Sequence, residues 1–286
     1  MSSDSHKIRT AQVKKSEKKT IIALTMPMVK GQNLQDNMLS DSSPGETFAE
    51  KNKNEQNLLV YRMLDQVSMV HEKGFAHRDL KPHNFMIDAL NIQLIDFGLS
   101  DDLKKTKIDG GSILFWPQEH KIGKPVYDQK KFDAYGLGLT LFALVLHLDM
   151  YKWIIECFGN YIDKYPTLGE EDKELKKSGF APSDCKKTKD RGLLNLLFAT
   201  MHAKNLLSQE TETFWVFLHT KLSESLAKNN DLSNSTKDAI LNLTAVNVKN
   251  RKTPTEARNE FFAANQPSIV AAVKNGVCQE RCRLKL

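Results

Sequence analysis

The spacing of apolar and polar residues near the start of the chain predicts a small β-structure. Strand-forming residues at 10–13 and again in the run TIIALTM are separated by the charged stretch KSEKK. Two such runs joined by a short polar segment predict a β-hairpin. Residues 36–55 are polar and contain Ser, Pro and Gly, so we expect a surface loop there.

Helical spacing dominates the rest of the chain. Leu59, Met63 and Val67 recur at helical intervals, which predicts an amphipathic helix from about 56 to 72, ended by Gly74. Two short β runs, FMID and IQLID, predict a second hairpin. An apolar helix is expected from 133 to about 151, followed by helical segments up to 265. A small β part followed by helices defines an α+β fold.

The stretch FAHRDLKPHNFMID contains an unusual number of polar and charged groups between apolar elements. Asn84 precedes the second hairpin and Asp96 follows it, so we expect both at its open end. A neutral and an anionic oxygen ligand suit Mg²⁺, which also binds phosphate oxygens. Asp79 is left to accept a proton or orient a hydroxyl, and Lys81 supplies positive charge for a phosphoryl group. These residue types predict phosphoryl transfer.

The motifs HRDLKPHN and DFG, at this spacing, resemble the catalytic and metal-binding loops of protein kinases. The resemblance implies that Asp79 is the catalytic base and that Asn84 and Asp96 bind Mg²⁺, with ATP as the phosphoryl donor. Lys81 resembles the lysine that contacts the γ-phosphate in serine/threonine kinases. The resemblance also makes His77 and Phe97 a stacked pair that holds the metal-binding loop, in which Gly98 is the third residue of DFG.

Further segments resemble the family in the expected order. In GSILFWPQE, Ser112 takes the place of a hydroxyl residue that touches the catalytic aspartate. In FDAYGLG, Asp133 resembles the aspartate that ties down the catalytic-loop backbone. In KNRKTPTEA, Arg251 resembles the arginine that forms a buried ion pair with the glutamate of the activation segment, here Glu119. Thr106 lies among lysines in the activation loop, where a phosphate is expected to contact Arg78.

The run LTMPMVKGQNL resembles the fifth strand and the hinge of a kinase. The resemblance makes Met26 the gatekeeper and places the Pro27 carbonyl and Val29 amide against adenine, with Met86 beneath the ring. It implies a protein-kinase-like large lobe at 35–265, a residual small-lobe hairpin and hinge at 1–34, and a C-terminal tail at 266–286.

The family's glycine-rich loop, strand lysine and helix glutamate have no counterpart before Met26. A fragment, a minimal kinase completed by a partner polypeptide, and a nucleotide-dead scaffold all stay open, and we expect Mg-ATP to bind this chain weakly. Within the enzyme hypothesis the substrate is a protein serine or threonine. The alternatives are a pseudokinase-like binding scaffold and, less favoured, a small-molecule phosphotransferase.

Charge, cysteine spacing and the longest apolar run bear on the partners and the cellular location of the protein. The net charge of +6 is mild and no basic stripe is interleaved with aromatic residues, so nucleic acid is not an expected partner. The four cysteines lack paired spacing, which favours reduced thiols in an intracellular, cytoplasmic protein, including one delivered into a host cytoplasm. The longest apolar run, 137–148, is too short to cross a bilayer.

Overall fold

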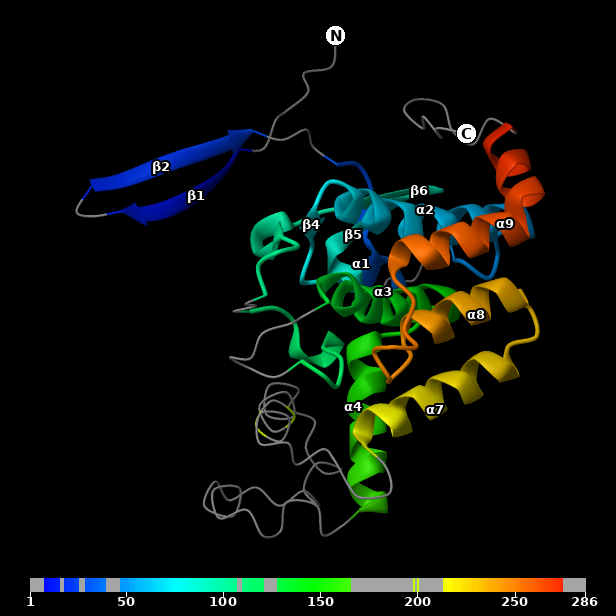
Figure 1. Ribbon diagram of the computed structural model, residues 1–286. Coiled ribbons are helices and arrows are strands. Elements are labelled where there is room, and N and C mark those ends of the chain that lie inside the picture. The colour runs from blue at the N-terminus through cyan, green and yellow to red at the C-terminus, as the bar shows by residue number, and fades with distance from the viewer. Residues whose placement is uncertain are drawn as a thin grey trace.

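The N-terminal hairpin predicted from the sequence is present. The structure, a computed structural model, describes residues 8–15, 18–25, 29–39, 47–106, 110–120, 128–165, 198, 200 and 213–274. Strand β1 (Ile8–Lys15) pairs antiparallel with β2 (Lys18–Thr25), with Lys15 opposite Lys18. Figure 1 shows the chain coloured from its N-terminus to its C-terminus.

The second predicted hairpin is also confirmed. Strands β5 (Phe85–Asp88) and β6 (Asn91–Leu94) pair antiparallel, and the short β3 (Gln32–Asn33) joins them in the order β3-β5-β6. Gly31 precedes β3 with a φ of +95°, and a Cβ there would lie 2.0 Å from the Ile87 carbonyl oxygen. Only glycine therefore lets the chain approach β5 this closely.

Part of the predicted loop at 36–55 is helical. Helix α1 (Leu34–Leu39) buries Leu34 and Met38, one turn apart, while Asn33 accepts a hydrogen bond from the Asp36 amide at 2.9 Å. The segment therefore has an apolar face that its polar composition concealed. Helix α2 (Lys53–Glu72) begins earlier than predicted, because Asn52 and Glu55 form a capping box.

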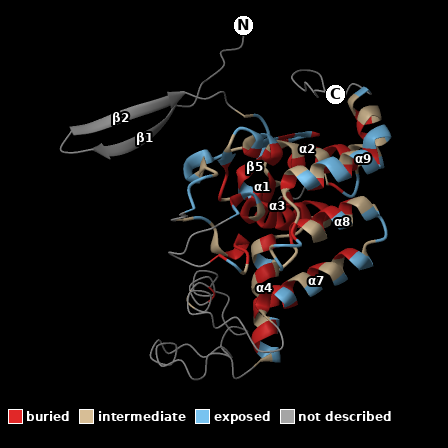
Figure 2. Cartoon of the chain, in the orientation of Figure 1, coloured by how far each residue is buried: buried red, intermediate tan, exposed pale blue. Residues whose placement is uncertain are grey.

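The predicted apolar helix at 133–151 is two helices. Helix α3 (Gln129–Leu146) is buried along most of its length (Figure 2), and α4 (Met150–Lys164) follows at an angle of 105°. His147 ends α3 with a φ of 47°, and Asp149 caps α4 by accepting a hydrogen bond from the Lys152 amide. In the described part of the chain no single helix has the length and apolarity of a membrane span, although the bent pair α3–α4 does by length and composition.

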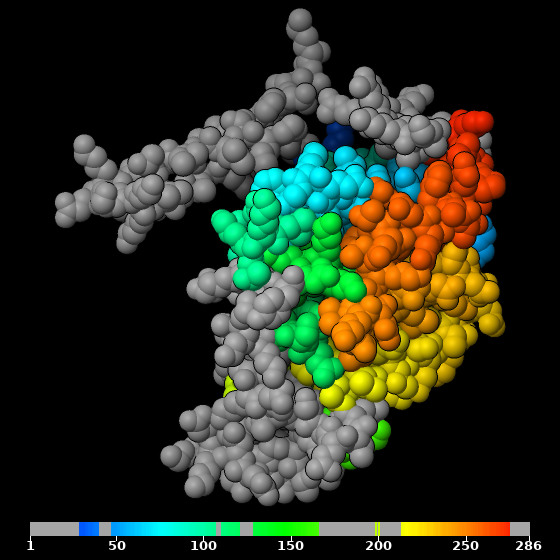
Figure 3. Space-filling view, viewed as in Figure 1, coloured from blue at the N-terminus to red at the C-terminus, as the bar shows by residue number. Residues whose placement is uncertain are grey.

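The C-terminal helices enclose α3 and α2. Helix α7 (Phe214–Lys228) packs on α4, α8 (Asn234–Leu243) packs on α3, and α9 (Pro254–Ala272) packs on α2 and α8. Figure 3 shows α7, α8 and α9 forming one continuous surface on the face in view. Because α9 buries Ile269 and Ala272, the boundary predicted at 265 falls inside a helix that belongs to the core.

Short elements connect these helices around the polar cluster. Strand β4 (Phe75–Ala76) pairs with β7 (Asp101–Asp102). Three 3₁₀ turns, η1 (Pro82–Asn84), η2 (Phe97–Leu99) and η3 (Ile113–Phe115), lie in the motifs identified from the sequence. The result is a helix-rich α+β fold with the polar residues of the sequence motifs between α3 and the β5–β6 hairpin.

Candidate active site

Asp133, on the buried central helix α3, anchors the backbone that precedes Asp79. Its carboxylate accepts hydrogen bonds from the His77 amide at 2.7 Å and from the Arg78 amide at 2.8 Å. It also contacts Nε2 of His71 at 2.8 Å. Arg78 has a φ of 70°, a strained conformation for a side chain of this size, which these bonds hold in place. The contact predicted for Asp133 is therefore present.

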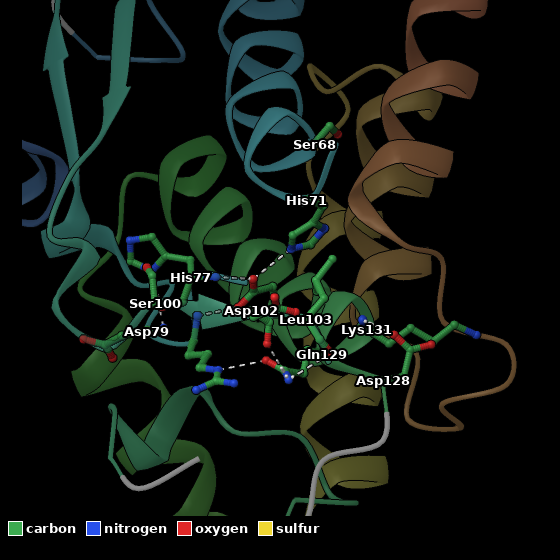
Figure 4. A network of polar contacts seen from close by, with 12 residues as sticks. Ser68, His71, His77, Asp79, Ser100, Asp102, Leu103, Asp128, Gln129 and Lys131 are labelled. Atoms are coloured by element: carbon green, nitrogen blue, oxygen red, sulfur yellow. Dashed lines mark hydrogen bonds and ion pairs between the residues drawn. The ribbon is translucent and has the colours of Figure 1, made fainter. Parts of the chain in front are cut away.

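Asp79, Lys81 and Ser112 form a compact polar triangle. Lys81 Nζ donates to Asp79 Oδ2 at 2.7 Å and to Ser112 Oγ at 2.8 Å, and the Ser112 amide donates to Asp79 Oδ1 at 2.9 Å. Burial by itself raises the pKa of the Asp79 carboxyl, but the bonds from Lys81 and Ser112 and the lysine charge bring that pKa below its usual value. Asp79 is therefore ionised at neutral pH and can accept a proton or a hydrogen bond. Figure 4 shows the Asp79 carboxylate pointing away from His71.

The backbone brings Asn84 and Asp96 to the open end of the β5–β6 hairpin. The Ile95 amide donates to the Asn84 carbonyl at 2.8 Å, which extends the ladder and leaves Asp96 one residue beyond it. The Asn84 side-chain amide donates to the carbonyl of Asp79 at 2.7 Å and to its carboxylate at 3.2 Å. Its NH₂ group therefore faces Asp79, and its side-chain oxygen is the atom left for a cation.

The donors at this hairpin end fit a hard divalent cation. Asp96 is exposed, and its Oδ1 accepts a bond from the Gly98 amide at 3.3 Å. One carboxylate and one amide oxygen match the few protein ligands that Mg²⁺ uses when phosphates supply the rest. Across the described ranges, no cluster of three or more His, Cys, Asp or Glu side chains offers another metal site.

His77 and Phe97 make the predicted contact in a different geometry. Their ring centroids lie 5.1 Å apart, but the planes are inclined by 62°, so the rings meet edge to face and are not stacked. This arrangement places the positive edge of one ring against the negative face of the other. His77 Nε2 also lies 3.0 Å from the Ile95 carbonyl, so His77 contacts the metal-binding loop at two points.

Glu119 and Arg251 form the predicted ion pair, at distances of 2.5 and 3.0 Å. The Arg251 side chain is fully buried and lies 5.1 Å from the centre of the Tyr135 ring. The Glu119 side chain is 33% exposed, so the pair is only half buried, contrary to the prediction. Glu119 is exposed although residues 114–117 and His120 around it are buried, whereas Arg251 is enclosed and also donates to the backbone carbonyls of Ala245 and Lys131.

The predicted activation-loop site, Thr106, is exposed. The Arg78 guanidinium is already bound by Asp101, by Gln129 and by the carbonyl of Lys105. Because Lys105 is the neighbour of Thr106, a phosphate on Thr106 would lie close to this arginine. Phosphorylation of Thr106 stays a prediction.

The predicted adenine-binding residues are only partly described. Met26 and Pro27 lie outside the described residues. Val29 and Met86 are half-buried, and β3 pairs with β5 so that Asn33 lies opposite Met86. Their contact with a nucleotide stays a prediction.

Two polar residues of the site, His71 and Gln129, were not identified from the sequence. His71 follows Val67 by one helical turn on the buried face of α2, so a polar residue on an apolar face was the available signal. Gln129 is buried at the first position of α3, with bonds to residues 26 and 51 positions away in sequence. No local pattern indicates such long-range bonds.

The fold and these contacts together define a protein-kinase-like large lobe. The sequence model of the family described as protein kinase domain matches residues 3–164, more than half of the 286 residues. The chain belongs to the protein kinase family.

Named relatives agree with this assignment. Sperm motility kinase 2B of Mus musculus is 33% identical over 97 residues, covering 32% of this chain and 20% of the mouse protein. Serine/threonine-protein kinase chk1 of Schizosaccharomyces pombe is 30% identical over 105 residues, covering 35% of this chain and 21% of the yeast protein. The aligned part therefore spans about a fifth of the length of these two relatives.

The fold also resembles a solved structure. A chain in the crystal structure of the yeast RNA Pol II CTD kinase CTDK-1 complex matches with a TM-score of 0.51 and 17% identity. The match covers 89% of this chain and 74% of the yeast chain. At this identity the likeness concerns the fold alone.

Proposed function

We propose that this chain transfers the γ-phosphoryl group of Mg-ATP to a serine or threonine hydroxyl of a protein. Asp79 accepts the hydroxyl proton, Lys81 neutralises charge on the transferring group, and Asn84 and Asp96 hold the metal ion. The γ-phosphorus–oxygen bond to ADP breaks, the bond to the acceptor oxygen forms, and the acceptor's proton passes to Asp79. When bound, Mg²⁺ supplies charge neutralisation on the phosphates.

The observation that carries this proposal is the environment of the Asp79 carboxylate. It is ionised and held by Lys81 and Ser112, and the backbone before it is fixed by Asp133, which accepts hydrogen bonds from the amides of His77 and Arg78. A carboxylate fixed in this way is oriented before substrate arrives, which is what a base in phosphoryl transfer requires. Lys81 lies within bonding distance of the same carboxylate, so positive charge is present where a phosphoryl group would pass.

The serine/threonine preference rests on two supports. Lys81 matches the residue type found in serine/threonine kinases at this position, and the relative from fission yeast carries that activity in its name. A protein substrate is favoured over a small molecule because the chain carries the GSILFWPQE segment and the Glu119–Arg251 pair. A pseudokinase-like binding scaffold, which would not transfer phosphate, is the alternative.

A transfer assay separates these functions. The chain is incubated with radiolabelled ATP, Mg²⁺ and three peptide libraries whose sole acceptor is Ser, Thr or Tyr. We expect labelling of the Ser and Thr libraries and its loss in Asp79→Asn. The control is Asp88→Asn, an exposed aspartate on β5, which should retain the wild-type rate. Binding of Mg-ATP without label on any library would favour the scaffold, and label on the Tyr library alone would refute the stated preference.

A further inference from the structure

The guanidinium of Arg78 donates hydrogen bonds to three residues, one on helix α3 and two in segment 101–106. Its Nε donates to Gln129 Oε1 at 2.8 Å, its Nη1 to Asp101 Oδ2 at 3.3 Å, and its Nη2 to the Lys105 carbonyl at 2.7 Å. The residue is buried, although it lies beside the partly exposed Asp79. The side chain next to the proposed base is therefore held by contacts within the protein itself.

Gln129 holds the arginine from the side of the central helix. Its side chain is buried, and its Nε2 donates to the Leu103 carbonyl at 3.2 Å and to the Asp102 carbonyl at 3.5 Å. One amide group thus joins Arg78 to the segment after β7, and Figure 4 shows the Gln129 side chain close to Leu103. Gln129 and Asp133 are one turn apart, so α3 holds both the side chain and the backbone amide of Arg78.

Asp101 supplies the negative charge on the opposite side. Its Oδ2 accepts the bond from Arg78, and its Oδ1 lies 2.8 Å from Lys105 Nζ. Hydrogen bonds from Lys105 and from the Asp102 amide lower the pKa of the Asp101 carboxyl, so this anion is present at neutral pH. The Asp101 carboxylate therefore binds the Arg78 guanidinium, which a phosphate on Thr106 would otherwise contact.

We infer that Gln129 and Asp101 are positioning residues that hold segment 101–106 against the catalytic loop without a phosphate on Thr106. The inference rests on the proposed function. Arg78 precedes Asp79 and has a strained backbone, so loss of the bonds to its side chain removes one of the two supports of the loop that orients the base, Asp133 being the other. Among the described residues, neither Gln129 nor Asp101 has a hydrogen bond or ion pair with Val29, Asn84, Met86 or Asp96. We therefore expect the effect in the transfer step and not in ATP binding.

The test uses the full chain after phosphatase treatment, with mass spectrometry confirming an unmodified Thr106. The wild type should transfer phosphate in this state. Gln129→Met, similar in size but without the amide, should lower kcat by about tenfold or more while KM for ATP changes by less than about twofold. Amide hydrogen exchange over 101–106 should become faster. Lys130→Ala, an exposed neighbour on α3, is the matched control.

Conservative variants separate positioning from a general structural role. Gln129→Glu retains the oxygen that accepts from Arg78 and should recover part of the rate lost in Gln129→Met. If Gln129→Met does not fold, Asp101→Asn serves instead, since that side chain is 32% exposed, and Asp101→Glu should restore the rate. Unchanged kcat and unchanged exchange in Gln129→Met, or in Asp101→Asn, would overturn the inference.

Failure of this inference can be distinguished from failure of the proposed function. If neither the wild type nor a Thr106-phosphorylated sample transfers phosphate, the proposed function fails, and hydrogen exchange over 101–106 still decides whether Gln129 and Asp101 hold the segment. If transfer depends on Asp79 but occurs only after Thr106 is phosphorylated, the proposed function stands and the inference is wrong.

Discussion

The carboxylate of Glu119 binds the guanidinium of Arg251 through two bonds, of 2.5 and 3.0 Å, across 132 positions of sequence. Arg251 also donates to the carbonyls of Ala245 at 2.8 Å and Lys131 at 3.1 Å. The arginine therefore joins the end of the activation segment, the start of α3 and the turn before α9. Its burial makes these bonds interdependent, because each removed partner leaves charge or carbonyls unsatisfied.

Replacement of this arginine should lower stability sharply. Arg251 is fully buried, so truncation to alanine leaves a cavity and removes the donors of several backbone carbonyls. Such truncations of large buried side chains cost about 2–5 kcal/mol, which for a chain of this size lowers Tm by roughly 10 °C. Arg251→Ala is compared by calorimetry with Arg258→Ala, since the Arg258 side chain is 18% exposed and its loss should cost about 1 kcal/mol or less. A Tm of Arg251→Ala within a degree of wild type would contradict the assignment.

The helices and strands whose apolar residues recur at a regular spacing could be predicted from the sequence. The β5–β6 hairpin and helix α2 follow from alternation and helical spacing, and their motifs located Asp79, Asn84 and Asp96 at the site. The contacts of Asp133 with the two amides and of Ser112 with Asp79 were available from the family resemblance. Local pattern and motif order were sufficient for these features.

Other features depend on contacts that no local pattern encodes. Helix α1 is only six residues long and its two buried apolar residues, Leu34 and Met38, are separated by polar ones, so composition favoured a loop. Gln129 acquires its role because α3 lies beside the segment after β7, a tertiary relationship. The partial exposure of Glu119 likewise follows from where its segment reaches the surface. These properties arise from packing between distant segments.

Close packing between α3 and the catalytic loop makes Gly136 a sensitive position. A Cβ at this glycine would lie 2.7 Å from the Leu80 carbonyl oxygen, next to Asp79. Gly136→Ala should therefore displace the loop, at a cost of about 1–3 kcal/mol in stability, and lower the transfer rate. Gly159→Ala is the control, because nothing lies within 4 Å of its added Cβ, and it should raise stability by about 0.5–1 kcal/mol. Equal Tm values for the two variants would refute the packing argument.

The lowered pKa of Asp79 predicts a pH-dependent contribution to stability. Since its carboxylate is favoured in the folded state, the contribution is complete above the unfolded value of 3.8 and is lost as the pH falls through the lower folded pKa. The Tm difference between wild type and Asp79→Asn should be constant from about pH 5 upward and change only below about pH 4. Thermal melts across this range test it.

Lys81→Gln provides the control for this pH dependence. Without the lysine, burial is the main influence left on Asp79, so its pKa should rise and the change should begin at higher pH. The same onset in wild type and Lys81→Gln would show that Lys81 does not set the ionisation of Asp79.

Asp96 should be required for metal-dependent nucleotide binding but not for folding. Its side chain is exposed, and its φ of 62° is better tolerated by asparagine than by alanine. Asp96→Asn retains an oxygen for the Gly98 amide bond while removing the charge that a cation would contact. Loss of one charge-assisted contact, about 1.5–3 kcal/mol, weakens binding by roughly tenfold to a hundredfold.

Isothermal titration with ATP, in the presence of Mg²⁺ and separately of a chelator, measures this effect. We expect Mg²⁺ to strengthen ATP binding by the wild type, and that gain to be largely lost in Asp96→Asn while its Tm stays close to that of wild type. Asp88→Asn, at the opposite end of the same hairpin, should keep the full gain from Mg²⁺. Equal dependence on Mg²⁺ in Asp96→Asn and wild type would remove Asp96 from the proposed metal site, because the charge it supplies would then have no part in holding the ion.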